Sequence, residues 1–317
     1  MSTALVTAPP VVAPTTPVAP AAATPESVPV PVIGTLAEYT AALDAVRAAG
    51  GTVGLVPTMG ALHDGHRSLI RRAADECDVV AVSIFVNPTQ FGDPADLAAY
   101  PRTLESDLEA VASAGGGLVF APSVHEMYPD RPGSMFTTVS VPALSGRWEG
   151  ASRPGHFDGV AAVVVKLLSA TGRCRAYFGE KDFQQLAIVR RAVRDLSLPA
   201  EVVGCATVRD RDGLALSSRN GRLSPDQRRS ALVLSRALQA GASLIDRGEE
   251  SPALVEAMMA RVVESEPSVT LDYAVVVRAD DLERTPTCAT VHPLRLLIAA
   301  TVGSVRLIDN LDPRPGR

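Results

Sequence analysis

The chain has few cysteines, no surplus of basic residues and no long uncharged apolar run, and each of these gaps removes a class of protein. Its four cysteines stand singly, which gives neither a disulfide framework nor a Cys-x-x-Cys metal motif. A formal net charge of -5 argues against a protein whose main partner is nucleic acid. No stretch combines the length and the freedom from charge of a transmembrane helix. We therefore expect a cytoplasmic protein that acts on small molecules, without a nucleic-acid or membrane partner.

The sequence also lacks the two commonest phosphate-binding loops, because it contains neither G-x-x-x-x-G-K-[ST] nor G-x-G-x-x-G. A P-loop kinase and an NAD-dependent dehydrogenase are therefore both disfavoured. If the protein binds a nucleotide, side chains must contact the phosphates.

Residues 1–32 consist almost entirely of Ala, Pro, Val, Thr and Ser, and eight of them are prolines. So many prolines prevent a helix and prevent pairing as a central strand. The segment lacks the basic start and unbroken apolar core of a secretory signal, and it lacks the arginines of a mitochondrial transit peptide. We expect a disordered tail with polyproline character.

The rest of the sequence alternates helical and strand patterns, and a chain of 317 residues is long enough for two domains. Continuous apolar runs are typical of strands that are covered on both faces. The predicted order is helix 35–48, strand 53–56, helix 65–77, strand 79–86, helix 101–114, strand 118–121, helix 160–168, strand 175–178 and a helix that ends at 196. This order predicts an α/β fold with a doubly wound, Rossmann-like parallel sheet over residues 33–207.

Residues 208–317 have a different character. They begin with a charged turn and a polar loop, and then show helices at 224–247 and 252–264 and short strands at 271–277, 294–300 and 305–308. We expect a smaller α+β domain that acts as a lid on the first domain.

The most informative segment is 54–66, where an apolar run breaks at Pro57 and Gly60 and leads to His63 and His66. This pattern predicts a strand, a tight loop and a helix start with two imidazoles on one face. The free N–H groups and positive dipole of a helix N-terminus suit a polyphosphate. Surface histidines or half of a zinc site are the alternatives, but zinc would need further ligands, and the four cysteines, Cys77, Cys174, Cys205 and Cys288, are scattered.

Polar residues follow the other predicted strands too, which is where a parallel sheet binds its ligands. The groups best suited to phosphate are an ammonium, two hydroxyls and a guanidinium, on Lys181, Ser217, Ser218 and Arg219. Taken alone, Lys181 has the alternative of a solvated charge, and 217–220 that of a turn before a helix. Their conjunction with the histidine pair favours a nucleotide site.

His63-Asp-Gly-His66 resembles the H-I-G-H signature of the nucleotidyltransferase superfamily. Six ordered motifs resemble those of the pantoate–β-alanine ligase family: Pro57-Thr-Met-Gly-Ala-Leu-His-Asp-Gly-His66, Phe85-Val-Asn-Pro-Thr-Gln-Phe-Gly92, Tyr100-Pro-Arg-Thr103, Arg153-Pro-Gly-His-Phe-Asp-Gly159, Tyr177-Phe-Gly-Glu-Lys-Asp-Phe-Gln-Gln185 and Asp212-Gly-Leu-Ala-Leu-Ser-Ser-Arg-Asn220. The likeness spans residues 53–220 and weakens toward Asn310. Arg67 and Thr89 depart from the family pattern: Arg67 is expected on the outer face of its helix, and Thr89 stands where it can alter the fit of pantoate's gem-dimethyl group.

The resemblance implies a ligase of pantothenate biosynthesis that uses ATP and Mg²⁺. In this family ATP activates the carboxylate of pantoate as an acyl adenylate with loss of pyrophosphate, and β-alanine then attacks to give pantothenate and AMP. The catalytic residues that the resemblance implies are His63, His66, Lys181, Ser217, Ser218 and Arg219. It implies further ATP contacts from Met59, Gly179, Asp182 and Val208, and pantoate contacts from Met59, Asn87, Gln90 and Gln185. No residue is assigned to a metal, and the family implies a homodimer.

Two other functions compete with this one. A cytidylyl- or adenylyltransferase that acts on a phosphorylated small molecule would share the sheet and the histidine pair. It would need additional basic residues for its acceptor, whereas the acceptor loops here offer Gln90 and Gln185. A non-catalytic nucleotide sensor would not need a complete set of phosphate contacts. The set is retained here, which argues against a sensor; it consists of His63, His66, Lys181 and Arg219.

Overall fold

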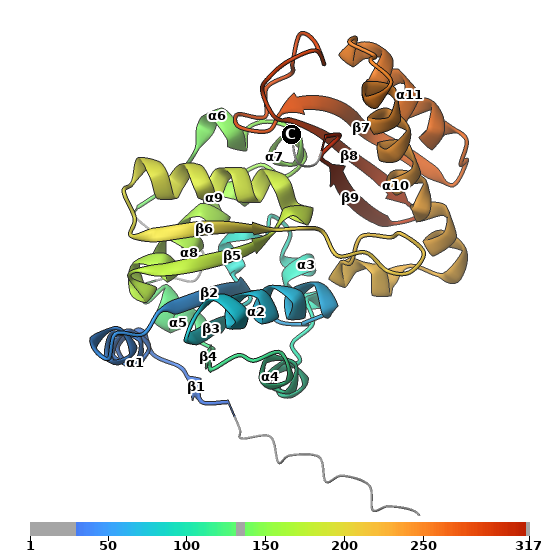
Figure 1. Cartoon of the computed structure of the whole chain (residues 1–317). Coiled ribbons are helices and arrows are strands. Elements are labelled where there is room, and N and C mark those ends of the chain that lie inside the picture. The colour runs from blue at the N-terminus through green and yellow to red at the C-terminus, as the bar shows by residue number, and fades with distance from the viewer. Residues whose placement is uncertain (1–29, 131–136, 315–317) are drawn as a thin grey trace, which may run out of the picture.

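The computed structural model describes residues 30–130 and 137–314, which form two sheets. Figure 1 shows the larger sheet among the blue to yellow segments and the smaller one in the orange to red part of the chain. Residues 1–29, most of the predicted tail, lie outside the described residues. Within the described ranges, no helix has both the length and the apolar character needed to span a bilayer.

The larger sheet has six strands, and every neighbouring pair in it is parallel. Their spatial order is β1 (Val32–Ile33), β4 (Leu118–Phe120), β3 (Val79–Ile84), β2 (Val53–Thr58), β5 (Cys174–Gly179) and β6 (Ala200–Cys205). The predicted doubly wound parallel sheet is thereby confirmed. The sequence pattern does not reveal the edge strands β1 and β6. Val32 pairs with Val119, so regular structure begins before residue 33, the predicted start of the domain.

Helices cover both faces of this sheet. One face carries α1 (Leu36–Ala48), α8 (His156–Thr171) and α9 (Phe183–Asp195), and the other carries α2 (Asp64–Glu76) and α4 (Leu104–Ser113). Successive strand residues point to opposite faces, so Leu55 is buried in the first layer and Val56 in the second. This double burial explains the continuous apolar runs of the central strands.

Short helical segments fill the connections, and the sequence pattern does not resolve most of them. They are η1 (Pro88–Gln90), α3 (Pro94–Ala99), α5 (Val124–Met127), α6 (Pro142–Ser145), α7 (Glu149–Ser152), η2 (Glu180–Asp182) and η3 (Ser218–Arg222). The predicted helix 101–114 begins only at Leu104, and the predicted strand 79–86 ends at Ile84. In both cases a proline, Pro101 or Pro88, keeps the adjoining chain irregular.

The smaller sheet is antiparallel, with β7 (Val269–Arg278), β8 (Leu294–Val302) and β9 (Val305–Leu311) in sequence order. The helices α10 (Pro225–Asp246) and α11 (Pro252–Glu264) share a buried core with these strands. A capping box between Ser224 and Gln227 sets the start of α10. The predicted α+β character of this part of the chain is confirmed.

A separate apolar cluster joins the two parts. Phe157 and Phe183 from the parallel-sheet part are buried against Val275, Val277 and Leu297 of the antiparallel sheet. Because these contacts bury side chains from both parts, the smaller sheet is held at the edge of the larger one where η2 begins.

Candidate active site

The strands β2 and β5 are neighbours in the larger sheet. After β2 the chain continues to β3 on one side of this pair, and after β5 it continues to β6 on the other side. Open parallel sheets bind ligands beyond the carboxyl ends of their strands at such a switch point. A cavity lies there, and residues that follow β2, β3, β5 and β6 line it; we call it the switch-point cavity. Its lining includes the sequence-predicted residues Met59, His63, His66, Gln90, Gly179, Lys181, Asp182, Gln185, Val208, Ser217, Ser218 and Arg219.

The two histidines of the cavity cap helix α2. His63 is the N-cap residue, and its Nδ1 accepts a hydrogen bond from the N–H of Gly65 at 3.2 Å. Nδ1 of His66 accepts from the N–H of His63 at 3.4 Å, which completes a capping box. Because each Nδ1 is an acceptor, the proton of each neutral ring lies on Nε2, the nitrogen left available as a donor.

The environment keeps this pair uncharged near neutral pH. Burial lowers the pKa of His63, and the charge of Lys181 lowers it further. Burial and the neighbouring His63 lower the pKa of His66 to about 3. A neutral imidazole of this tautomer can accept the cap bond at Nδ1 and still donate a hydrogen bond from Nε2 to a phosphate oxygen.

The loop before the histidines is held by a buried carboxylate. Asp107 of α4 accepts hydrogen bonds from the N–H of Ala61 at 3.0 Å and of Leu62 at 2.7 Å. Gly60 has a φ of 82°, and a Cβ there would lie 2.9 Å from the Asp107 carboxylate. Nothing in the local sequence marks Asp107 as part of this site.

Gln90 presents its amide to the cavity from a fixed position. Its Oε1 accepts from Nδ2 of Asn87 at 3.0 Å, and the same Nδ2 donates to the carbonyl of Gly159 at 3.1 Å. The hydroxyl of Tyr128 donates to Oδ1 of Asn87 at 2.8 Å. The Oε1 atom of Gln90 is therefore occupied, and its Nε2 is the atom turned toward a ligand.

Asn87 and Thr89 support Gln90 from outside the lining of the cavity. Asn87 is 1% exposed and is the one sequence-predicted site residue that does not line the switch-point cavity. The hydroxyl of Thr89 donates to Oδ1 of Asn87 at 2.9 Å. Thr89, which departs from the family pattern, therefore helps to hold Asn87, the residue that bonds to Gln90. The other departure, Arg67, is partly exposed and lies 3.6 Å from Asp64.

A second support reaches Gln90 from the start of α8. Nδ1 of His156 lies 2.8 Å from the backbone carbonyl of Gln90, and Nε2 lies 3.1 Å from a guanidinium nitrogen of Arg153. Arginine can only donate, so Nε2 accepts and Nδ1 carries the proton that bonds to Gln90. Burial and the charge of Arg153 lower the pKa of His156 to about 4, which fits this neutral form.

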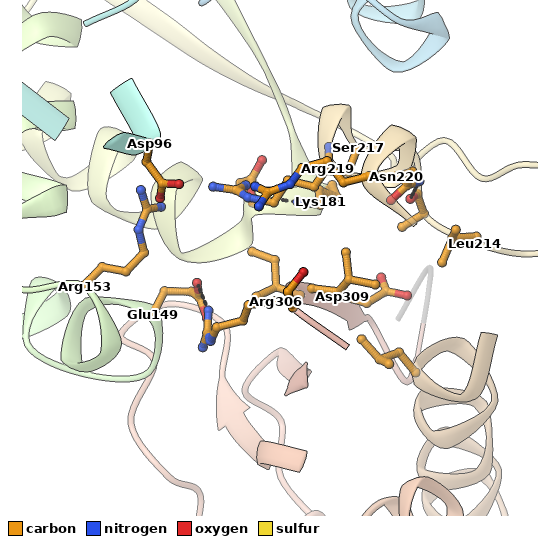
Figure 2. A pocket seen from close by; sticks show the side chains of 17 residues that line it. Asp96, Glu149, Arg153, Lys181, Leu214, Ser217, Arg219, Asn220, Arg306 and Asp309 are labelled. Atoms are coloured by element: carbon orange, nitrogen blue, oxygen red, sulfur yellow. Dashed lines mark hydrogen bonds and ion pairs between the residues drawn. The ribbon is translucent and has the colours of Figure 1, made fainter. Parts of the chain in front are cut away.

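A further cavity continues from the first and shares Arg153, Lys181, Asp182, Ser217 and Arg219 with it; we call it the outer cavity. Figure 2 shows Lys181 and Arg219 together on one wall and Arg306 on the wall opposite. Nζ of Lys181 lies 3.2 Å from the carboxylate of Asp182. Although burial would raise it, the pKa of Asp182 is lowered, because the charge of Lys181 and its hydrogen bond outweigh burial.

The cavity lining also contains three residues to which the sequence motifs assign no role. They are Arg153, His156 and Tyr100, which lie in motifs that resemble those of the family. Arg153 lines the cavity and donates to the neutral ring of His156, a contact that leaves its positive charge uncompensated. Arg153 lies before the start of α8, so no helical spacing in the sequence marks its contact with His156.

These features are typical of one class of protein: an α/β enzyme whose switch-point cavity carries imidazole, ammonium and guanidinium groups that suit the phosphates of a nucleotide. Comparison with known proteins narrows that class. Residues 31–312 match the family described as pantoate-beta-alanine ligase. The chain belongs to this family, and it is a ligase that forms pantothenate.

The relatives are similar over nearly their whole length. The pantothenate synthetase of Cereibacter sphaeroides is 52% identical over 282 residues, which are 89% of this chain and 99% of that protein. The enzyme of Rubrobacter xylanophilus is 50% identical over 268 residues, 83% of this chain and 92% of its own.

Solved structures agree. Pantothenate synthetase from Thermus thermophilus matches with a TM-score of 0.82 and 45% identity, over 90% of this chain and all of that one. Pantoate-beta-alanine ligase from Francisella tularensis, in complex with beta-gamma ATP and beta-alanine, matches with a TM-score of 0.71 and 32% identity, over 90% of this chain and 99% of that one.

Proposed function

We propose that the switch-point cavity binds ATP beside pantoate and that its donor groups promote transfer of the adenylyl group to the pantoate carboxylate. The observation that supports this proposal is that His63, His66 and Lys181 line one cavity, although they follow two different strands, β2 and β5. Attack on the α-phosphate gathers negative charge on its oxygens and on the leaving pyrophosphate. Donors fixed before the reaction stabilise that charge without reorganisation.

We assign the remaining ATP contacts from the residues that line the two cavities. Ser217, Ser218 and Arg219 border both cavities or their junction, so we place the β- and γ-phosphates there. Asp182 and the N–H of Gly179 are placed at the ribose, and the backbone at Val208 at the adenine. The Francisella tularensis relative, solved with beta-gamma ATP and beta-alanine, supports ATP as a substrate of this chain as well.

Pantoate is placed at Gln90 and Gln185, with the backbone of Met59 nearby. Neutral amides can bind its hydroxyls and its carboxylate without over-stabilising the carboxylate oxygen that must attack phosphorus. The amine of β-alanine then attacks the acyl carbon of the pantoyl adenylate. A C–N bond forms, the C–O bond to AMP breaks and the amine loses a proton. No covalent bond to the protein is needed.

Mg²⁺ fits this scheme as an ion that is carried by ATP. Among residues 30–130 and 137–314, no three His, Cys, Asp or Glu side chains converge on one point. Mg²⁺ in nucleotide sites keeps several waters and is held largely by phosphate oxygens. When bound there, it would neutralise charge on the phosphates.

The test is isotope exchange. We expect pantoate to promote exchange of labelled pyrophosphate into ATP in the absence of β-alanine, and AMP to appear in net amounts only when all three substrates are present. Gln90→Ala and Gln185→Ala should weaken exchange through pantoate, with a smaller effect on ATP binding. Exchange that needs β-alanine, or that proceeds without pantoate, would rule out the adenylate order and favour the rival nucleotidyltransferase.

We further propose that residues 208–317 act as a lid, that the enzyme is a homodimer and that it is cytoplasmic. Arg306 and Asp309 of β9 line the outer cavity, so a shift of the smaller sheet would open or close it. The cysteines are free thiols, as suits a reducing compartment. Scattering with and without ATP and pantoate would test closure and the dimer.

A further inference from the structure

The last strand of the chain inserts one side chain beneath the turn that carries Lys181. Nδ2 of Asn310, in β9, donates to the backbone carbonyl of Glu180 at 2.9 Å and to that of Lys181 at 2.8 Å. Asn310 is 3% exposed. Both carbonyls belong to η2, the single turn between β5 and α9.

The orientation of the Asn310 amide is fixed by other buried groups. Its Oδ1 accepts from Nε of Arg295 at 2.7 Å, and the same guanidinium donates to the carboxylate of Glu180 at 2.8 Å. Arg295 also lies over the ring of Phe183, 4.2 Å from its centroid. Since Oδ1 is held by a donor, the Nδ2 group must face η2, and it uses both of its hydrogens there.

The backbone on the other side of Asn310 is fixed as well. The N–H of Asn310 donates to Asp309 at 2.8 Å, and Asp309 receives two bonds from the guanidinium of Arg209, at 2.7 and 2.9 Å. Paired charges and satisfied amides of this kind make a network that is costly to break at one member. The network therefore holds η2 to the antiparallel sheet as one unit.

The turn itself has little to fix its shape locally. It has three residues and no side-chain cap at its start. Among the residues that the structure describes, Lys181 forms one ion pair, with Asp182; it lies within the same turn and cannot fix where that turn lies. The contacts from Asn310 come from a residue 129 positions further along the chain. The place of the Lys181 ammonium thus depends on the smaller sheet.

We propose that Asn310 is a positioning residue for Lys181: it fixes η2 so that the ammonium meets the α-phosphate only while the antiparallel sheet is docked. This inference rests on the role of Lys181 given above. It makes the smaller sheet a part of the adenylyl-transfer site rather than only a cover for it.

The test is a double-mutant cycle on pantoate-dependent ATP–pyrophosphate exchange. Asn310→Ala should lower kcat by about tenfold or more and change the KM for pantoate by less than about twofold, because Gln90 is held by Asn87 and His156, which lie outside the antiparallel sheet. In a Lys181→Ala background the same change should lower kcat by less than about twofold, since an effect exerted through Lys181 has nothing left to act on. A loss of kcat that is equal in both backgrounds would overturn the proposal, as would wild-type kcat in Asn310→Ala.

The matched control is Trp148→Phe, which removes a single hydrogen bond between the same two parts of the chain, from Nε1 to the carbonyl of Leu282 at 3.1 Å. We expect lower stability and unchanged kcat. If Asn310→Ala does not fold, Arg295→Lys replaces it: the charge near Glu180 is kept, the bond to Asn310 is lost, and the same dependence on Lys181 is expected. Activity retained by Lys181→Ala alone would instead refute the proposed role of Lys181, a result distinct from any obtained with Asn310.

Discussion

His66 accepts a hydrogen bond from the backbone N–H of His63, and the two rings lie 4.1 Å apart. One imidazole thus has two tasks, because Nδ1 caps a helix while Nε2 faces the cavity. The tasks can be separated by substitution. An asparagine amide reproduces the position of Nδ1, and a glutamine amide reproduces that of Nε2.

For His66→Asn we expect a near-wild-type melting temperature and a turnover lowered about a hundredfold, the cost of one transition-state contact worth about 3 kcal/mol. His66→Gln should recover about tenfold of that loss and be less stable, because its cap is lost. Steady-state kinetics of both variants measure the turnover, and thermal unfolding measures the melting temperature. Equal turnover in the two would show that Nε2 is not the contact.

Lys181 can be examined by chemical labelling, because Lys166 is the only other lysine in the chain. Nζ of Lys166 donates to the carbonyl of Met127 and lies 5.5 Å from the ring centroid of Tyr128, away from the switch-point cavity. Saturating ATP should slow acylation of Lys181 about tenfold or more and leave Lys166 unaffected. Peptide mass spectrometry gives both rates from one sample.

Lys181→Ala should fold and lose about a hundredfold in turnover. Protection of both lysines to the same extent would indicate a global change of structure instead of a contact at Lys181.

The sequence predicted the parts of the site that depend on local order. His63 and His66 follow from a strand, a loop and a helix start, and Lys181 from its place after a strand. The supports of these residues could not be predicted in this way. Asp107 contacts the loop at Leu62 from 45 residues away, and Asn87 bonds to Gly159 across 72 residues. Such pairs have no spacing that marks them.

The same limit explains what was missed in the fold. β1 has two residues, too few to show a period of alternation. It exists because Val32 and Ile33 pair with β4. The motif beside Gln90 predicts that Asn87 contacts pantoate, and this stays a prediction. What the motif does not show is that Asn87 lies outside the cavity lining and donates to Gln90 and to Gly159 of α8.

The stability of the protein should depend on the protonation of His156. Burial and Arg153 lower its pKa to about 4 in the folded protein, whereas an unfolded chain has a histidine pKa of about 6.5. Between these values the unfolded state binds a proton that the folded state does not. The stability that depends on neutral His156 is therefore fully present above about pH 6.5, and it is lost as the pH falls toward about 4.

His156→Asn keeps a donor for the carbonyl of Gln90 and removes this titration. The free energy of unfolding of the wild type should fall by about 2 kcal/mol more than that of the variant between pH 7 and pH 4.5. Urea unfolding at both pH values measures it. Parallel pH curves for the two proteins would mean that His156 is not held in its neutral form.

The close approach of α8 to η1 predicts a substitution that weakens the binding of pantoate and not that of ATP. A Cβ on Gly159 would overlap the carbonyl oxygen of Thr89 and would lie 2.7 Å from the nitrogen of Gln90. Both neighbours are backbone atoms, so Gly159→Ala must move η1, and Gln90 with it. We expect the KM for pantoate to rise about tenfold or more while ATP binding changes by less than about twofold, because the ATP contacts come from other strand ends.

Gly92→Ala is the matched control in the same loop, since a Cβ there would meet no atom within 4 Å. It should leave both substrates unaffected. Calorimetry with ATP and kinetics with pantoate distinguish the outcomes: if Gly159→Ala weakens both substrates alike, the helix has shifted as a whole. If it weakens neither, the docking of η1 on α8 does not set the position of Gln90, and the role given to Asn87 as its support would also have to be abandoned.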